Sequence, residues 1–163
     1  MDSRAKLCPV ATDAAIDAAE RELGFLLPAT LRVLYTQVGN GGFGPGLGIM
    51  GLTGGHTDDL GDDVVRAYNL FAQTPKNGSN WLWPGQLLRL THWGCAIYSC
   101  VDCSKPEAPV IVWDPNCWHE DKASPASAMA QESPSLEAWI ADWAASVRLW
   151  DRITELTASL YPQ

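Results

Sequence analysis

The residues with the clearest chemical potential are the seven glycines between positions 39 and 51. They satisfy the pattern G-x-G-x-x-G twice, a spacing that can cradle the phosphates of a dinucleotide. Such a loop follows a strand and opens a helix, whereas this stretch follows a predicted helix. We therefore predict a helix end and the entry to a short strand near 47–50, and no nucleotide site.

Cysteine and histidine provide a second set of candidate ligands, for zinc: Cys95, Cys100, Cys103, Cys117 and His119. Cys100 and Cys103 have the C-x-x-C spacing, but residues three apart in an extended strand point to opposite faces. Cys117 and His119 are closer together than the ligands of a usual zinc site. We predict small buried side chains and no metal, with a zinc site or a redox thiol as the alternatives.

The sequence contains none of the common signatures of nucleophilic or metal-assisted hydrolysis. There is no G-x-S-x-G or H-E-x-x-H pattern, and the three histidines are too far apart to share one helix face. We therefore predict a protein that is not an enzyme and has no catalytic residues or cofactor. A catalytic triad assembled in space leaves no such pattern, so a small enzyme stays an alternative.

Aspartates are concentrated in the segment 57–63, at Asp58, Asp59, Asp62 and Asp63. Carboxylates at the start of a helix are stabilised by the helix dipole, which is the structural interpretation. The segment lacks the alternating D-x-D-x-D-G register of a calcium loop. The same carboxylates are also suited to docking a basic partner, and the two interpretations are compatible.

Eight tryptophans are many for a chain of this length. Three of them recur at spacings of four and seven in the last predicted helix, which predicts core positions: Trp139, Trp143 and Trp150. Three others lie in loops rich in Pro, Asn and Asp: Trp81, Trp83 and Trp118. Because aromatic anchors in polar surroundings are typical of binding hot spots, these three are either a satellite core or partner contacts.

Length and composition indicate a single domain, residues 1–163, with its core over about 12–155. Eleven Lys and Arg against nineteen Asp and Glu give a net charge of −8. Because such a surface repels phosphate backbones, we exclude nucleic acid as a partner. No apolar run could span a bilayer and the first twenty residues lack a secretion signal. We therefore predict a cytoplasmic protein without a membrane partner, whose five cysteines are free thiols.

The order of predicted elements indicates an α+β fold. Helical spacing and capping residues predict helices over 12–23, 28–38, 57–71 and 133–153. Runs of β-forming residues predict an antiparallel meander of three strands, over 86–92, 95–102 and 109–113. The expected architecture is an antiparallel sheet with flanking helices and a long C-terminal helix.

Short motifs follow one another along most of the chain: Glu20-x-x-Leu23-Gly24, Leu27-Pro28, Asn40-Gly41-Gly42, Trp83-Pro84, His92-Trp93-Gly94-Cys95, Val101-Asp102, Pro109-Val110 and Trp113-Asp114-Pro115. Their order and spacing, from about Ala14 to Trp143, resemble the SUKH superfamily. The similarity is to the branch related to the fungal Smi/Knr regulators of cell-wall synthesis.

The resemblance implies an α+β domain and, in bacteria, an immunity protein that binds a cognate polymorphic toxin and occludes its active site. Many such toxins are nucleases, so the expected partner is a basic protein toxin. The alternatives are a non-enzymatic regulator or scaffold of the same family, and a small enzyme or zinc-binding protein. We expect the acidic residues and the loop tryptophans to contact the partner: Asp58, Asp59, Asp62, Asp63, Trp81, Trp83, Trp118, Glu120 and Asp121.

Overall fold

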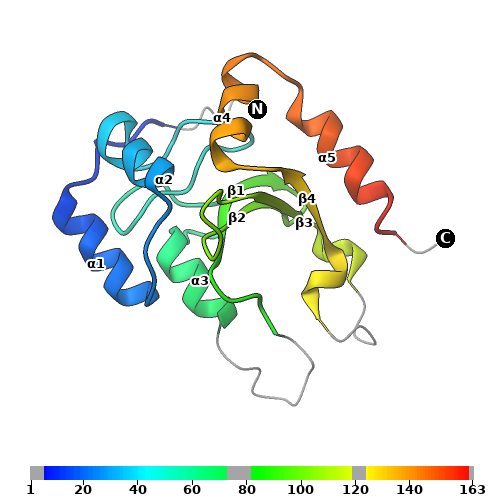
Figure 1. The fold of residues 1–163 in the computed structure, drawn as a ribbon, viewed down its shortest axis with the longest axis horizontal. Coiled ribbons are helices and arrows are strands. Elements are labelled where there is room, and N and C mark those ends of the chain that lie inside the picture. The colour runs from blue at the N-terminus through cyan, green and yellow to red at the C-terminus, as the bar shows by residue number, and fades with distance from the viewer. Residues whose placement is uncertain (1–5, 73–81, 119–123, 162–163) are drawn as a thin grey trace.

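A four-stranded antiparallel sheet lies at the centre of the computed structural model, which describes residues 6–72, 82–118 and 124–161 (Figure 1). The strands follow one another in chain order: β1 (Leu87–Gly94), β2 (Ile97–Asp102), β3 (Val110–Trp113) and β4 (Met129–Ser133). The first three confirm the predicted meander. The sequence does not predict β4, because its polar residues Gln131, Glu132 and Ser133 give no alternation of apolar and polar positions.

The turn between β1 and β2 gives the sheet its longest hairpin. Cys95 and Ala96 both have positive φ, at 52° and 61°, as the mirror-image turns of tight hairpins require. The strands pair from Leu87 opposite Asp102 to Gly94 opposite Ile97. Two irregularities in the register of β1 lie at 89–91 and 92–94. Each irregularity leaves one residue of β1, Leu90 or Trp93, without a direct partner on β2.

The glycine-rich segment covers the outer edge of β1. The amide of Met50 donates to the carbonyl of Leu90 at 2.8 Å, and the amide of Leu47 donates to the carbonyl of His92 at 2.9 Å. Ile49 forms the one bridge between this segment and the strand, so the predicted strand near 47–50 is reduced to a single pair. At Gly41, where φ is 82°, a Cβ would lie 2.5 Å from the carbonyl oxygen of Ile49. The glycines therefore permit close backbone packing along the strand edge.

In the described part of the chain, five α-helices surround the sheet: α1 (Asp13–Leu23), α2 (Ala29–Val33), α3 (Val64–Ala72), α4 (Leu136–Ala144) and α5 (Leu149–Ala158). The hydroxyl of Thr12 caps α1 by accepting from the amide of Ala15. A π-helical turn, Leu34–Val38, continues α2, so the predicted second helix changes its winding within its length. α3 packs beside β1, whereas α5 packs beside β3 and β4 at the opposite side of the sheet (Figure 1).

The predicted long C-terminal helix is two helices, α4 and α5, joined by a tight connection. The chain turns at Ser146, whose φ of 61° is left-handed. No Gly or Pro marks this break, which is why helical spacing alone misses it. Folding back brings Asp142 and Arg152 together, with 2.6 Å between carboxylate and guanidinium, and lets α5 pack against the sheet.

A buried carboxylate joins the sheet to α4. Glu132 of β4 is 5% exposed, and its two carboxylate oxygens accept hydrogen bonds from Ser99 Oγ at 2.5 Å and Trp139 Nε1 at 2.6 Å. Trp93 Nε1 donates in turn to Ser99 Oγ at 2.8 Å. Burial raises the pKa of the Glu132 carboxyl, and the two hydrogen bonds and the charge of Arg152 oppose that rise. The network links β1, β2, β4 and α4.

Glu132 makes stability depend on pH with a definite sign. The pKa of the Glu132 carboxyl is higher in the folded protein than in the unfolded one. The contribution of this group to the free energy of unfolding is therefore complete below the ordinary pKa of 4.5 and is lost as pH rises through the raised pKa. The loss is at most about 1.4 kcal/mol per pH unit. We expect Glu132→Gln, which keeps an acceptor for Trp139, to remove this part of the pH dependence in urea unfolding from about pH 5 upward.

Glu137→Gln is the matched control, because Glu137 is an exposed glutamate in the first turn of α4. It should leave the pH dependence of the unfolding free energy as in the wild type. A free-energy difference between wild type and Glu132→Gln that stays constant with pH would contradict the role of the buried carboxylate.

Candidate protein-binding site

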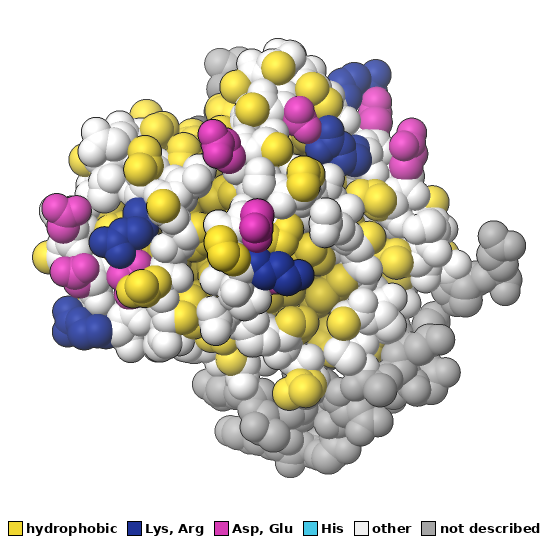
Figure 2. All heavy atoms as spheres, in the orientation of Figure 1, with side chains coloured by type: hydrophobic (Ala, Val, Ile, Leu, Met, Phe, Trp, Pro, Cys, Tyr) yellow, Lys and Arg dark blue, Asp and Glu magenta, His cyan; other side chains and the backbone are white. Residues whose placement is uncertain are grey.

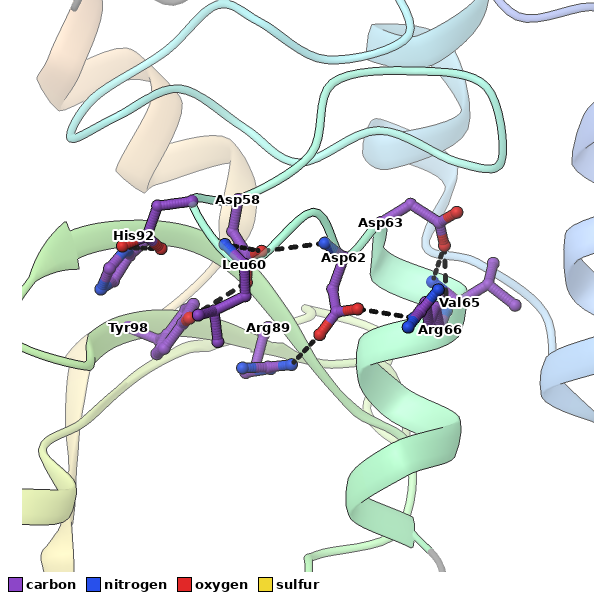
Figure 3. A network of polar contacts seen from close by, with 10 residues as sticks. Asp58, Leu60, Asp62, Asp63, Val65, Arg66, Arg89, His92 and Tyr98 are labelled. Carbon is purple, nitrogen blue, oxygen red and sulfur yellow. Dashed lines mark hydrogen bonds and ion pairs between the residues drawn. The ribbon is translucent and has the colours of Figure 1, made fainter.

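The acidic segment 57–63 forms a tight loop before α3 (Figure 3). The amide of Asp58 donates to the carbonyl of Asp62 at 3.0 Å, and the amide of Gly61 donates to the carbonyl of Asp58 at 3.1 Å. Gly61 has a φ of 83°, which the turn requires. The predicted third helix begins only at Val64, because aspartate side chains compete with helical hydrogen bonding near the backbone.

Asp58 holds this loop together and anchors it to the sheet. Its Oδ1 accepts from the amides of Leu60 at 3.0 Å and Asp62 at 2.9 Å, and its Oδ2 accepts from the hydroxyl of Tyr98 at 3.0 Å. Burial raises the pKa of Tyr98, so its hydroxyl remains a donor. Asp58 is 8% exposed. It is therefore a loop-holding residue and not a free docking carboxylate, which corrects its predicted role.

Asp62 is also turned inward, toward two arginines. Its carboxylate lies 2.7 Å from Arg66 Nε and 3.8 Å from Arg89 Nη2. Arg89 is itself buried, with its guanidinium 4.1 Å from the ring centre of Phe71 and 4.7 Å from that of Tyr98. Because a buried charge is costly without an opposite partner, Asp62 serves Arg89 and not a docking partner. Its predicted role is corrected in the same way.

Asp63 and Asp59 lie at the two borders of the loop. Asp63 Oδ1 accepts from the amides of Val65 at 3.0 Å and Arg66 at 2.9 Å, which confirms the capping interpretation for this residue. Asp59 is exposed, and its carboxylate lies 2.8 Å from Nδ1 of the buried His92. Of the four aspartates, Asp59 is therefore the one whose carboxylate is most accessible to a partner.

The loop presents an apolar residue that the predicted contact set omits. Leu60 is 73% exposed at the tip, between the exposed Asp59 and Gly61. The hydrogen bonds of Asp58 hold the backbone on both sides of it, so Leu60 is presented in one arrangement. Its one signal in the sequence is a single leucine between two pairs of aspartates.

The loop tryptophans have different environments. Trp83 is 5% exposed, donates from Nε1 to the carbonyl of Leu87 at 2.8 Å, and packs edge-on against Phe71 and Trp113. It belongs to the core, so its predicted role as a partner contact is corrected. Trp118 is half-buried and packs against the core. The other predicted contacts lie outside the described residues: Trp81, Glu120 and Asp121.

The C-terminal tryptophans divide differently from the prediction. Trp139 is completely buried, as predicted, but Trp143 and Trp150 are 38% and 42% exposed. The break between α4 and α5 explains this, because it moves both indoles to the ends of short helices where the sheet no longer covers them.

The cysteines are spread over different environments. Cys100 and Cys117 are buried, as predicted, whereas Cys95 is exposed in the β1–β2 turn. Burial raises the pKa of Cys100, and that of Cys117 to about 11, so both thiols stay protonated at neutral pH. Among the described residues, no three His, Cys, Asp or Glu side chains gather where they could hold a metal ion. His119, the remaining candidate ligand, lies outside them.

A family model for the SMI1 / KNR4 family (SUKH-1) matches residues 10–142. The chain belongs to this family. The match spans the glycine-rich segment, the acidic loop, the whole sheet and most of α4. It confirms the resemblance and the α+β fold expected of a SUKH domain. A comparison with curated proteins found no match.

No helix within the described residues is long and apolar enough to cross a membrane. A surface hollow of about 520 Å³ lies between the end of α1 and the start of α2. The carboxylate of Glu20, one of its lining residues, already accepts from the amide of Leu27 and from Arg32. The exposed tip of the acidic loop is therefore the stronger candidate site.

The different roles of Asp58 and Asp59 can be separated by mutation. We expect Asp58→Ala to lower the free energy of unfolding by about 2–3 kcal/mol, because it leaves two buried donors and one part-buried donor without their acceptor. Asp59→Ala removes one contact of an exposed carboxylate and should cost less than about 1 kcal/mol. Urea denaturation of both variants measures the difference, and equal losses would contradict the assignment.

Proposed function

We propose that this protein is an immunity protein that binds a cognate polymorphic toxin and neutralises it by occluding the toxin's active site. Membership in the SMI1 / KNR4 family over residues 10–142 carries the proposal. The mechanism is steric and electrostatic, and no bond is made or broken in the immunity protein. We place its action in the cytoplasm, where free thiols such as its five cysteines are stable.

The distribution of charge supports a basic partner. The net charge is −8, and six Lys and Arg side chains of the described residues already pair with carboxylates of the same chain: Arg32, Arg66, Arg89, Lys105, Arg148 and Arg152. The charge left for a partner is therefore mostly negative. A toxin that cleaves nucleic acid has a cationic cleft for phosphates, toward which such a surface is steered.

The preformed acidic loop supports a contact at Asp59 and Leu60. An exposed leucine beside a carboxylate combines an apolar contact with a charged one, and the loop does not have to become ordered when the partner binds. Trp118 remains part of the proposed contact because part of its side chain is accessible. The proposal also includes the three candidates that lie outside the described residues: Trp81, Glu120 and Asp121.

Coexpression with the toxin encoded beside the gene tests the proposal. We expect the two proteins to copurify and the immunity protein to restore growth of cells that express the toxin. We expect Asp59→Lys to weaken binding about tenfold or more, since it reverses the charge that faces a basic surface. Asp17→Lys, a charge reversal at an exposed position of α1, is the matched control.

The alternative in the same family is a regulator or scaffold that does not act on a toxin. A pair that neither copurifies nor restores growth would contradict the immunity function. A gene neighbourhood without a toxin, together with binding to a different protein, would favour the regulator.

A further inference from the structure

The connection between α4 and α5 exposes two tryptophans that the acidic loop does not involve. Trp143 and Trp150 are each about two-fifths exposed, and Val147 between them is 42% exposed. Residues 143–148 are all exposed, so the whole connection faces outward. Figure 2 shows hydrophobic side chains among charged ones over this upper part of the molecule. We call Trp143, Val147 and Trp150 the aromatic surface.

One member of the aromatic surface, Trp150, is held in place from beneath. The ring of Trp150 lies 5.7 Å from that of Trp93, whose Nε1 donates to Ser99 Oγ. Ser99 donates to the buried Glu132, which also accepts from Trp139 of α4. The chain of contacts fixes both helices relative to the sheet. Indoles that are ordered before binding lose little conformational entropy when a partner covers them.

The charged side chains at the border of this surface pair with each other, within α4, α5 and the connection between them. Asp142 and Arg152 lie 2.6 Å apart, and Arg148 and Asp151 lie 3.0 Å apart. A tryptophan pair bordered by arginine has the composition of protein-binding hot spots, in which Trp and Arg are enriched. Local charge therefore does not oppose an apolar contact here.

The charge of the whole chain favours a basic partner over a second copy. Two copies would each bring a net charge of −8 to the contact, and their mutual repulsion would oppose a dimer. A protein with an apolar pocket and surrounding Lys or Arg gains from both the indoles and the overall charge.

Consecutive residues of β1 connect the aromatic surface to the acidic loop. His92 lies against Asp59 of the loop, and Trp93 lies against Trp150. Because consecutive residues of a strand point to opposite faces, the two sites lie on opposite faces of the sheet, close to its β1–β2 turn. A partner that buries about 800 Å² of this protein covers a patch roughly 30 Å across, enough to reach around that turn.

We infer that Trp143 and Trp150 are the apolar anchors for the basic protein partner, and that the acidic loop provides a charged contact from the other face of the sheet. The inference rests on the proposed function and names a second part of the same interface. It adds two residues that sequence spacing assigns to the core.

Isothermal titration of purified variants with the toxin encoded beside the gene tests the inference. We expect Trp143→Ala and Trp150→Ala each to weaken binding about 30-fold or more, the size of a hot-spot effect. Leu26→Ala is the matched control, since Leu26 is 71% exposed in the connection between α1 and α2. It should change the dissociation constant less than about threefold. Thermal unfolding establishes that each variant is folded.

Val147→Glu keeps the test decisive if a tryptophan variant does not fold, because Val147 is exposed in the connection. It should weaken binding about tenfold or more by placing a charge on the exposed connection that joins the helices of the two tryptophans. Wild-type binding that none of these substitutions weakens would overturn this inference and leave the proposed function standing. No binding by the wild type would overturn both. A dimer in light scattering that Trp150→Ala dissociates would assign the surface to a second copy and overturn the inference.

Discussion

The Asp58 carboxylate accepts three hydrogen bonds, which together close the acidic loop and attach it to the sheet. Two of its donors are amides of the loop, from Leu60 and Asp62, and the third is the hydroxyl of Tyr98 on β2. A carboxylate that accepts three hydrogen bonds can be buried. Without these bonds the loop would be free to change its shape. Together with two backbone hydrogen bonds within the loop, this side chain determines the position of Leu60.

The sheet carries a buried acidic group on each of its faces. Tyr98 and Ser99 are consecutive residues of β2, so their side chains point to opposite faces. Tyr98 holds Asp58 of the acidic loop, and Ser99 holds Glu132 beneath α4 and α5. The fold thereby positions two exposed features, the loop tip and the aromatic surface, from a single strand. In a protein whose proposed activity is binding, such ordering serves recognition.

Much of the fold can be predicted from sequence, because its signals are local. Thr12, Gly24 and helical spacing determine α1, and β-forming runs determine the first three strands. β4 has no such signal, because its buried positions are polar and become acceptable only when Ser99 and Trp139 bond Glu132. The break at Ser146 is equally invisible, since neither Gly nor Pro marks it and tertiary packing stabilises it.

The candidate site was harder to predict because residue type does not determine exposure. Asp58 and Asp59 are adjacent and identical, yet one is buried as a hydrogen-bond acceptor and the other is exposed. Spatial partners distant in sequence decide the difference: Tyr98 lies forty residues from Asp58. Likewise Trp83 is buried among aromatic rings, whereas Trp150, which has core spacing, is half exposed.

The acidic loop is already folded in the free protein, and amide hydrogen exchange followed by NMR tests this most directly. The amides of Leu60 and Asp62 are the donors to Asp58 Oδ1. Both should exchange at least about a hundredfold more slowly than in an unstructured peptide, corresponding to roughly 2.7 kcal/mol of protection. Exchange of these two amides at the unstructured rate would contradict the account.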